Sequence, residues 1–213
     1  MKQVEITITI FSIINQEIKI LLIKKQSDPY KGYWMIPKIN ADFKQSIDDS
    51  VKEIITKLNL KGVNLFQSKT ISDMEREEGL NYINIAYIGI IDSVRVQIGD
   101  SESVYEKEWF AIDKIPKTAY NYQKIIENNI CYLREIMKKA STLNLFFPSD
   151  FSLPEMQSAV EKISFKKFDR RNFRKKIIEA NIVEEMEEKQ ENGLGRPPKL
   201  YMFKEVYKDI DIY

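Results

Sequence analysis

Seven lysine and arginine side chains are concentrated between residues 166 and 176, where Asp169 is the single acid. Arginine can bind guanine or a phosphate through paired donors, and asparagine can pair with adenine, so such residues can both position a protein on DNA and read its bases. The predicted DNA contacts in this run are Lys167, Arg170, Arg171, Asn172, Arg174 and Lys175. The competing interpretation is that the run is only a solvated helix face.

A second basic segment favours the DNA-binding interpretation. Residues 195–199 read Gly-Arg-Pro-Pro-Lys, which predicts a rigid basic hairpin tip suited to the DNA backbone or the minor groove. Arg196 and Lys199 therefore join the predicted DNA contacts. The acids between Glu184 and Glu188 weaken the positive field of this hairpin and are an argument against it.

Two predicted helices position the basic run. The first begins at Ser152, which is followed by Pro154 and Glu155, the pattern of a capped first turn. The second is capped by Asp169 and buries a predicted apolar stripe. That stripe consists of Phe173, Ile177 and Ile178. The basic side chains can then project outward from the helix, near its positive N-terminal end.

The remainder of this unit completes a winged helix. Predicted strands at Ile182–Val183 and Lys199–Phe203 are joined by a long polar segment that holds two glycines and two prolines. The segment from Ser141 to Asp150 breaks the helical period of the chain before it. We therefore predict a winged-helix DNA-binding domain over residues 141–213.

The N-terminal part of the chain predicts β structure followed by a helix. Val4–Ile10 and Ile18–Leu22 alternate apolar and polar residues on either side of Asn15-Gln16, which is typical of two half-buried strands in a hairpin. From Ser46 to Leu60 the apolar residues change to helical spacing behind a serine cap.

Further strands and one more helix follow. Tyr82–Ile91 is a β-branched and aromatic run that predicts a strand buried on both faces. Strands are also predicted over Val94–Ile98 and Glu108–Ile112, and a helix over Tyr122–Lys139. The fold class is therefore α/β (α+β), with a mixed sheet and flanking helices in a domain over residues 1–140, ahead of the winged helix.

The composition of the chain excludes several classes of catalytic and metal site. The 33 basic residues nearly balance the 32 acidic ones, so any nucleic-acid affinity must come from local clusters. No histidine is present, which removes the serine-histidine and cysteine-histidine catalytic arrangements and most zinc sites. The lone Cys131 predicts a small buried side chain in a reducing, cytoplasmic setting. Neither a signal peptide nor a membrane span is predicted.

Three blocks in order resemble the winged-helix signature of the Nudix-related transcriptional regulators, and the resemblance covers nearly the whole chain. They are residues 151–157 (FSLPEMQ), 168–176 (FDRRNFRKK) and 195–201 (GRPPKLY). The resemblance implies a homodimer that represses or activates genes of NAD metabolism or sugar utilisation. It also implies a DNA operator as partner and a small-molecule effector, such as ADP-ribose or a sugar, bound in the Nudix-like domain.

The same resemblance places a Nudix box over Lys38–Leu60. An active box holds Mg²⁺ or Mn²⁺ with glutamates on one helix face. Here the positions that hold glycine, glutamate or arginine in an active box carry Lys38, Lys44, Lys52, Thr56, Lys57 and Asn59. Thr56 and Lys57 stand in place of the two metal-binding glutamates. We therefore predict no catalytic residue, no metal, no cofactor and no hydrolase activity.

An effector could still bind where an enzyme would hold its metal. The predicted effector contacts are Trp34, Lys38, Lys44, Lys52, Lys57 and Tyr87, with lysines as anion ligands and aromatic rings for stacking. For the helical lysines, plain solvated charge is the competing interpretation. Two functional alternatives stay open: a divergent Nudix hydrolase acting on a nucleoside diphosphate derivative, and a DNA-binding regulator whose first domain is only a dimerisation scaffold.

Overall fold

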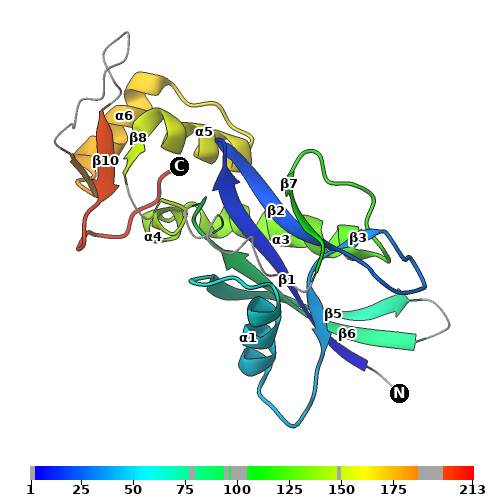
Figure 1. Cartoon of the computed structure of the whole chain (residues 1–213). Coiled ribbons are helices and arrows are strands. Elements are labelled where there is room, and N and C mark those ends of the chain that lie inside the picture. Colours follow the sequence, from blue (N-terminus) through cyan, green and yellow to red (C-terminus); the bar gives the residue numbers. More distant parts are fainter. Residues whose placement is uncertain (1–2, 77–79, 94–95, 97–104, 148–149, 187–198) are drawn as a thin grey trace. The chain divides into compact units, whose positions relative to one another are not determined.

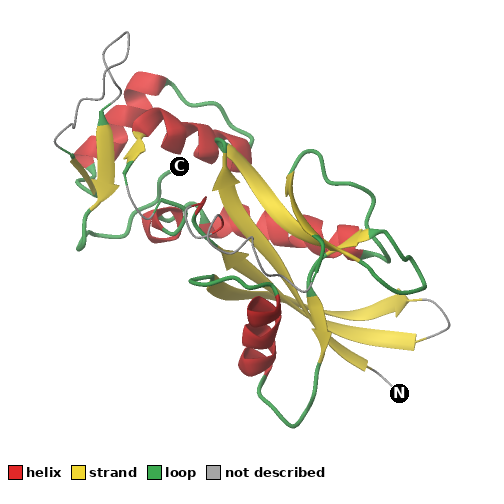
Figure 2. Ribbon diagram, in the orientation of Figure 1, coloured by secondary structure: helices red, strands yellow, loops and turns green. Residues whose placement is uncertain are grey.

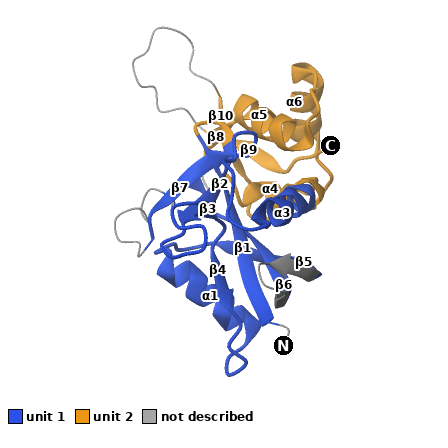
Figure 3. Cartoon of the chain, turned by 90° about the vertical axis from the view of Figure 1, so that its right-hand side faces the viewer, with its two compact units in different colours: residues 1–14, 18–133 blue, residues 15–17, 134–213 orange. Residues whose placement is uncertain are grey.

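The computed structural model describes residues 3–76, 80–93, 96, 105–147, 150–186 and 199–213. The chain forms two compact units, one of residues 1–14 and 18–133 and the other of residues 15–17 and 134–213 (Figure 3). This division falls inside helix α3 (Tyr122–Ile136). The domain boundary predicted between residues 140 and 141 stays a prediction.

The first unit is built on a mixed sheet with strand order β3-β2-β1-β6-β5, in which β4 also pairs with β1 and β7 with β2 (Figure 1). The strands are β1 (Gln3–Ile14), β2 (Glu17–Lys24), β3 (Trp34–Met35), β4 (Lys38–Asn40), β5 (Asn64–Arg76), β6 (Leu80–Ile90) and β7 (Lys107–Ala111). The central pair, β1 and β6, is parallel, and it runs in register from Gln3 opposite Tyr82 to Phe11 opposite Ile90.

Helices contact both faces of this sheet. The helix α1 (Ile47–Lys57) is on the face of Tyr87, whose hydroxyl donates to Asp48 at 3.3 Å. On the other face, Asn129 of α3 donates a hydrogen bond to Thr9 of β1. Because both faces are covered, residues 5–12 of β1 are all buried, polar ones included. The prediction of a half-buried first strand is therefore wrong for β1.

The second unit contains a three-stranded antiparallel sheet, β8-β10-β9, and three helices (Figure 2). Its elements are α4 (Ala140–Asn144), β8 (Phe151–Ser152), α5 (Leu153–Ser164), α6 (Arg170–Glu179), β9 (Val183–Glu185) and β10 (Leu200–Phe203). This order is that of a winged helix.

The predicted helix starts are confirmed at the level of hydrogen bonds. Ser46 and Asp169 each accept the backbone N–H of the third residue of the helix that follows. Ser152 and Glu155 form the reciprocal capping box that satisfies two free N–H groups at the start of α5.

Four local expectations were wrong or incomplete. Val96, the described residue of the predicted strand 94–98, is helical and donates its N–H to Asp92 four residues earlier at 3.2 Å; the other residues of that strand lie outside the described ones. Cys131 and Ile178 are exposed, because each lies on the outer side of its helix, beside a buried neighbour. The strand β5 was not predicted, since residues 64–76 carry many polar side chains.

A buried asparagine fastens α3 to the sheet. Asn129 is fully buried and donates to Thr9 Oγ1 at 2.8 Å and to the carbonyl of Tyr87 at 3.3 Å, while its own carbonyl accepts from Ser68 Oγ at 2.6 Å. One side chain thus links α3 to β1, β5 and β6.

We expect Asn129→Leu to lower the free energy of unfolding by about 1–3 kcal/mol, because Thr9 and Ser68 lose their buried partner while the side chain keeps a similar size. Asn128→Leu, on the part-exposed neighbouring position, is the matched control. Urea unfolding followed by tryptophan fluorescence, which reports on Trp34 and Trp109 of this unit, measures both. Equal effects of the two variants would contradict the role of Asn129.

Candidate nucleic-acid interface

The basic run lies on α6, which is anchored by apolar contacts. Phe173 and Ile177 are buried, and the ring of Phe168 lies 6.0 Å from that of Phe173 between centroids. The remaining positions of α6 between Arg170 and Lys176 are exposed. This arrangement leaves one charged face of the helix available to a partner.

The turn that leads into α6 is held by Glu161 of α5. Its carboxylate accepts the backbone N–H of Phe168 at 3.0 Å, the amide of Gln157 at 2.9 Å and the ammonium of Lys167 at 2.7 Å. Gln157 also donates to the carbonyl of Phe168 at 2.8 Å. These hydrogen bonds, that of Lys167 first, lower the pKa of Glu161 to about 2.

The exposed cations of α6 differ in their surroundings. Arg170, Arg171 and Asn172 have exposed side chains, and within the described part of the chain no ion pair involves either arginine. Lys175 lies 3.8 Å from Glu179, one turn along α6. Surface pairs of this length contribute little to stability, so Lys175 stays available to a phosphate.

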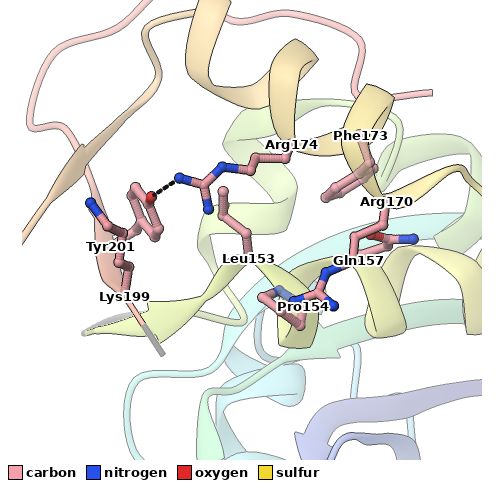
Figure 4. A pocket seen from close by; sticks show the side chains of 8 residues that line it. All are labelled: Leu153, Pro154, Gln157, Arg170, Phe173, Arg174, Lys199 and Tyr201. Atoms are coloured by element: carbon pink, nitrogen blue, oxygen red, sulfur yellow. Dashed lines mark hydrogen bonds between the residues drawn. The ribbon is translucent and has the colours of Figure 1, made fainter. Parts of the chain in front are cut away.

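Arg174 points toward the hairpin strand β10. Its Nη2 donates to the hydroxyl of Tyr201 at 3.1 Å (Figure 4). A pocket lies between the start of α5, α6 and β10, and is lined by Leu153, Pro154, Gln157, Arg170, Phe173, Arg174, Lys199 and Tyr201 (Figure 4). Arg170, Lys199 and the Gln157 amide in this hollow form a surface suited to an anion such as a DNA phosphate, while Arg174 is held by Tyr201.

The structure brings together Arg170, Arg174 and Lys199 of the predicted DNA contacts, while Lys167 is engaged by Glu161. Arg196 lies outside the described residues. Sequence reasoning missed Gln157 and Tyr201. The sequence signal for Tyr201 was its place in the alternation of β10, where a buried polar ring needs a hydrogen-bond partner.

Three of the four predicted effector lysines form ion pairs within the first unit. Lys38 pairs at 2.6 Å with Glu5, whose side chain is fully buried, and Lys52 pairs with Asp49 at 3.1 Å. Lys57 pairs with Glu53 at 2.6 Å, and Lys44 is exposed. These pairs do not gather the four ammonium groups around one anion.

The two aromatic effector candidates also have protein partners. Trp34 lies edge-on to Phe110, with ring centroids 4.9 Å apart, and the ammonium of Lys24 lies 5.4 Å from the Trp34 ring. Tyr87 is buried and donates to Asp48. A shared effector site at these residues stays a prediction.

The described residues contain neither a metal-binding cluster nor a membrane-spanning helix. Among residues 3–76, 80–93, 96, 105–147, 150–186 and 199–213, no three His, Cys, Asp or Glu side chains come together in a group able to hold a metal ion. No helix within these same ranges is both long and apolar enough to cross a bilayer.

Comparison with known proteins identifies the second unit. Residues 145–203 match the family model of the NrtR DNA-binding winged helix domain. This match confirms the winged helix that the sequence predicted for the second unit. A relative from Acinetobacter baylyi, described as an ADPR responsive transcriptional repressor, is 24% identical over 205 residues, which cover 93% of this chain and 80% of the relative.

Two other similarities extend this result. The crystal structure of Shewanella oneidensis NrtR complexed with a 27mer DNA has a TM-score of 0.76 and 20% identity, and covers 94% of this chain and 93% of that chain. The shared fold confirms the predicted fold class. An ADP-ribose pyrophosphatase of Methanocaldococcus jannaschii is 25% identical over 122 residues, 57% of this chain and 71% of that protein.

The lowered pKa of Glu161 predicts how the turn before α6 responds to acid. Because the folded pKa is about 2 and the ordinary value is 4.5, the carboxylate stabilises the fold fully above pH 4.5 and loses this effect as the pH falls toward 2. We expect Glu161→Gln to lower the melting temperature at pH 7, and this difference from the wild type to shrink below pH 4.5. Calorimetry across this range measures it.

Glu179→Gln is the control, since Glu179 is an exposed acid on α6 with only a long surface pair. A deficit of Glu161→Gln that is the same at pH 7 and pH 3 would contradict the assigned pKa.

Proposed function

We propose that this protein is a sequence-specific DNA-binding transcriptional repressor whose Nudix-like first unit binds a small-molecule effector of the ADP-ribose class. The observation that carries the proposal is the NrtR-type winged helix, in which α6 presents Arg170 and Arg171 to solvent beside a basic pocket. The Acinetobacter baylyi repressor, described as ADPR responsive, supports the effector class.

In this proposal the first unit is not a hydrolase, because it lacks the paired glutamates that would hold a metal ion. On α1, the two positions of the paired metal-binding glutamates carry Thr56 and Lys57. Glu53, which keeps the box pattern, accepts hydrogen bonds from Lys57 and Gln45, and these lower its pKa. A lysine within 2.6 Å of that carboxylate opposes the binding of Mg²⁺ there.

A divergent hydrolase is the second candidate, and the Methanocaldococcus jannaschii ADP-ribose pyrophosphatase is the observation that favours it. The two candidates differ in turnover. We expect no AMP release when the purified chain is incubated with ADP-ribose and Mg²⁺ or Mn²⁺. Sustained release that Lys57→Ala leaves unchanged would support the enzyme instead.

The proposal includes a homodimer that binds two DNA half-sites. Two-fold symmetric dimers of helix-turn-helix modules place their recognition helices one helical turn, or a multiple of it, apart on the DNA. The operator is then expected to be an imperfect palindrome, which selection of duplexes from a random pool with the full chain would reveal.

Arg171 is the residue of α6 that we expect to contribute most directly to specificity. Arg171→Ala should weaken binding to the selected duplex by about 1–3 kcal/mol and binding to unrelated DNA by less, because a paired contact to guanine is lost. Fluorescence anisotropy on both duplexes measures this. Lys117→Ala, which removes one exposed positive charge from the first unit, is the matched control. Equal losses on the two duplexes would assign Arg171 to the DNA backbone.

The effector is tested on the same assay. We expect saturating ADP-ribose to weaken binding to the selected duplex by about 5–150-fold, the usual range of coupling between two sites on one protein. Ribose 5-phosphate and AMP are the matched control compounds. Unchanged DNA affinity, together with no thermal stabilisation by ADP-ribose, would favour a first unit that serves only as a dimerisation scaffold.

A further inference from the structure

Polar contacts join α6, the recognition helix of the proposed function, to the strands β9 and β10 of the hairpin. Arg174 Nη2 donates to the hydroxyl of Tyr201 at 3.1 Å (Figure 4). That hydroxyl donates to Glu185 Oε2 at 3.4 Å. Glu185 also binds the ammonium of Lys199 through its other oxygen. One contact series thus runs from α6 through β10 to β9.

Tyr201 is buried and its ring faces α6, which places its hydroxyl between Arg174 and Glu185. Its side chain is 1% exposed, whereas Met202 beside it is 38% exposed, so the alternation of β10 turns the tyrosine ring inward toward α6. A buried hydroxyl needs a partner, and Arg174 supplies the donor. The guanidinium carbon of Arg174 also lies 5.9 Å from the centroid of the Tyr201 ring.

From this geometry we infer that Arg174 is a positioning residue, which locks the wing (β9 and β10) onto the recognition helix and does not itself read a base. The inference rests on the proposed DNA-binding function. Arginine that reads guanine presents its paired terminal donors to the base edge, whereas one N–H of Arg174 Nη2 is held by Tyr201, which directs the guanidinium toward β10. Arg170 lines the same pocket and, unlike Arg174, has no side-chain hydrogen bond to another described residue, so it is the DNA contact of this pair.

The lock also gives Glu185 a role within the protein. An acid in a DNA-binding hairpin repels phosphate, but the Glu185 carboxylate is engaged by the Tyr201 hydroxyl and by Lys199. Its negative charge holds the base of the wing together and is compensated locally. The position of Lys199 over the pocket therefore depends on the same lock.

A double-mutant cycle on the full chain tests the inference. Tyr201→Phe removes only the hydroxyl, and Arg174→Gln removes the guanidinium. Each should weaken binding to a duplex selected from a random pool by about threefold to tenfold. The double variant should bind no worse than Arg174→Gln, because the hydroxyl acts only through the arginine. The salt dependence of binding should stay unchanged in all three, since no phosphate contact is lost.

The matched control is the same cycle with Arg170→Gln. In this cycle the loss of affinity of the double variant should equal the product of the losses of Arg170→Gln and Tyr201→Phe. In Arg170→Gln the slope of log affinity against log salt should become shallower by about 1. Multiplying losses in the Arg174 cycle, with a shallower salt slope for Arg174→Gln, would overturn the lock and make Arg174 a direct DNA contact.

A measurement without DNA separates this inference from the proposed function. In hydrogen–deuterium exchange of the free protein, Tyr201→Phe and Arg174→Gln should speed amide exchange in β9 and β10 equally, and Arg170→Gln should not. If the wild type binds no DNA, the proposed function fails, and this exchange result alone decides whether the lock exists. Unchanged exchange in both lock variants would overturn it.

Discussion

The turn that leads into the recognition helix depends on one carboxylate, that of Glu161. It accepts the Phe168 backbone N–H, the Gln157 amide and the Lys167 ammonium, and thereby connects α5 to the residues just before α6. Without this acid, the Phe168 N–H would lose its partner and Lys167 would add to the repulsion within the basic run. Because Glu161 holds this turn, the direction in which α6 presents its charged face is fixed.

The cations of the second unit divide into two groups by their partners. Lys167, Arg174 and Lys199 are engaged by groups of the same unit, and they shape the turn and the wing. Arg170 and Arg171 project from α6 with exposed side chains. This local cluster of positive charge explains how a chain with 33 basic and 32 acidic residues can bind a polyanion. The acidic residues lie elsewhere or form ion pairs with lysines that hold the fold.

Sequence patterns predicted the features that depend on neighbouring residues. The caps at Ser46, Ser152 and Asp169 were predictable because a capping side chain bonds to an N–H only a few residues away. The partners of Lys38 and Arg174 were not, because Glu5 and Tyr201 come close only through strand pairing and helix packing. Sequence reasoning therefore located the basic helix but not the partners that some of its cations have within the protein.

The interior of the first unit was the least predictable part. The burial of Glu5 and Thr9 on β1 follows from the covering of both sheet faces, which an alternating sequence does not reveal. There, Glu5 is compensated by Lys38, and Asn84 and Tyr122 add hydrogen bonds at 3.2 Å each. In this network Lys38, a predicted effector ligand, is the counter-ion of a buried carboxylate.

The most direct test of DNA binding through α6 is hydrogen–deuterium exchange of the full chain with and without a duplex selected from a random pool. The account predicts slower exchange on DNA binding in peptides that cover Phe168–Glu179 and Leu200–Phe203, with peptides of β1 and β6 unchanged. Slower exchange confined to the first unit, with α6 unaffected, would contradict the account.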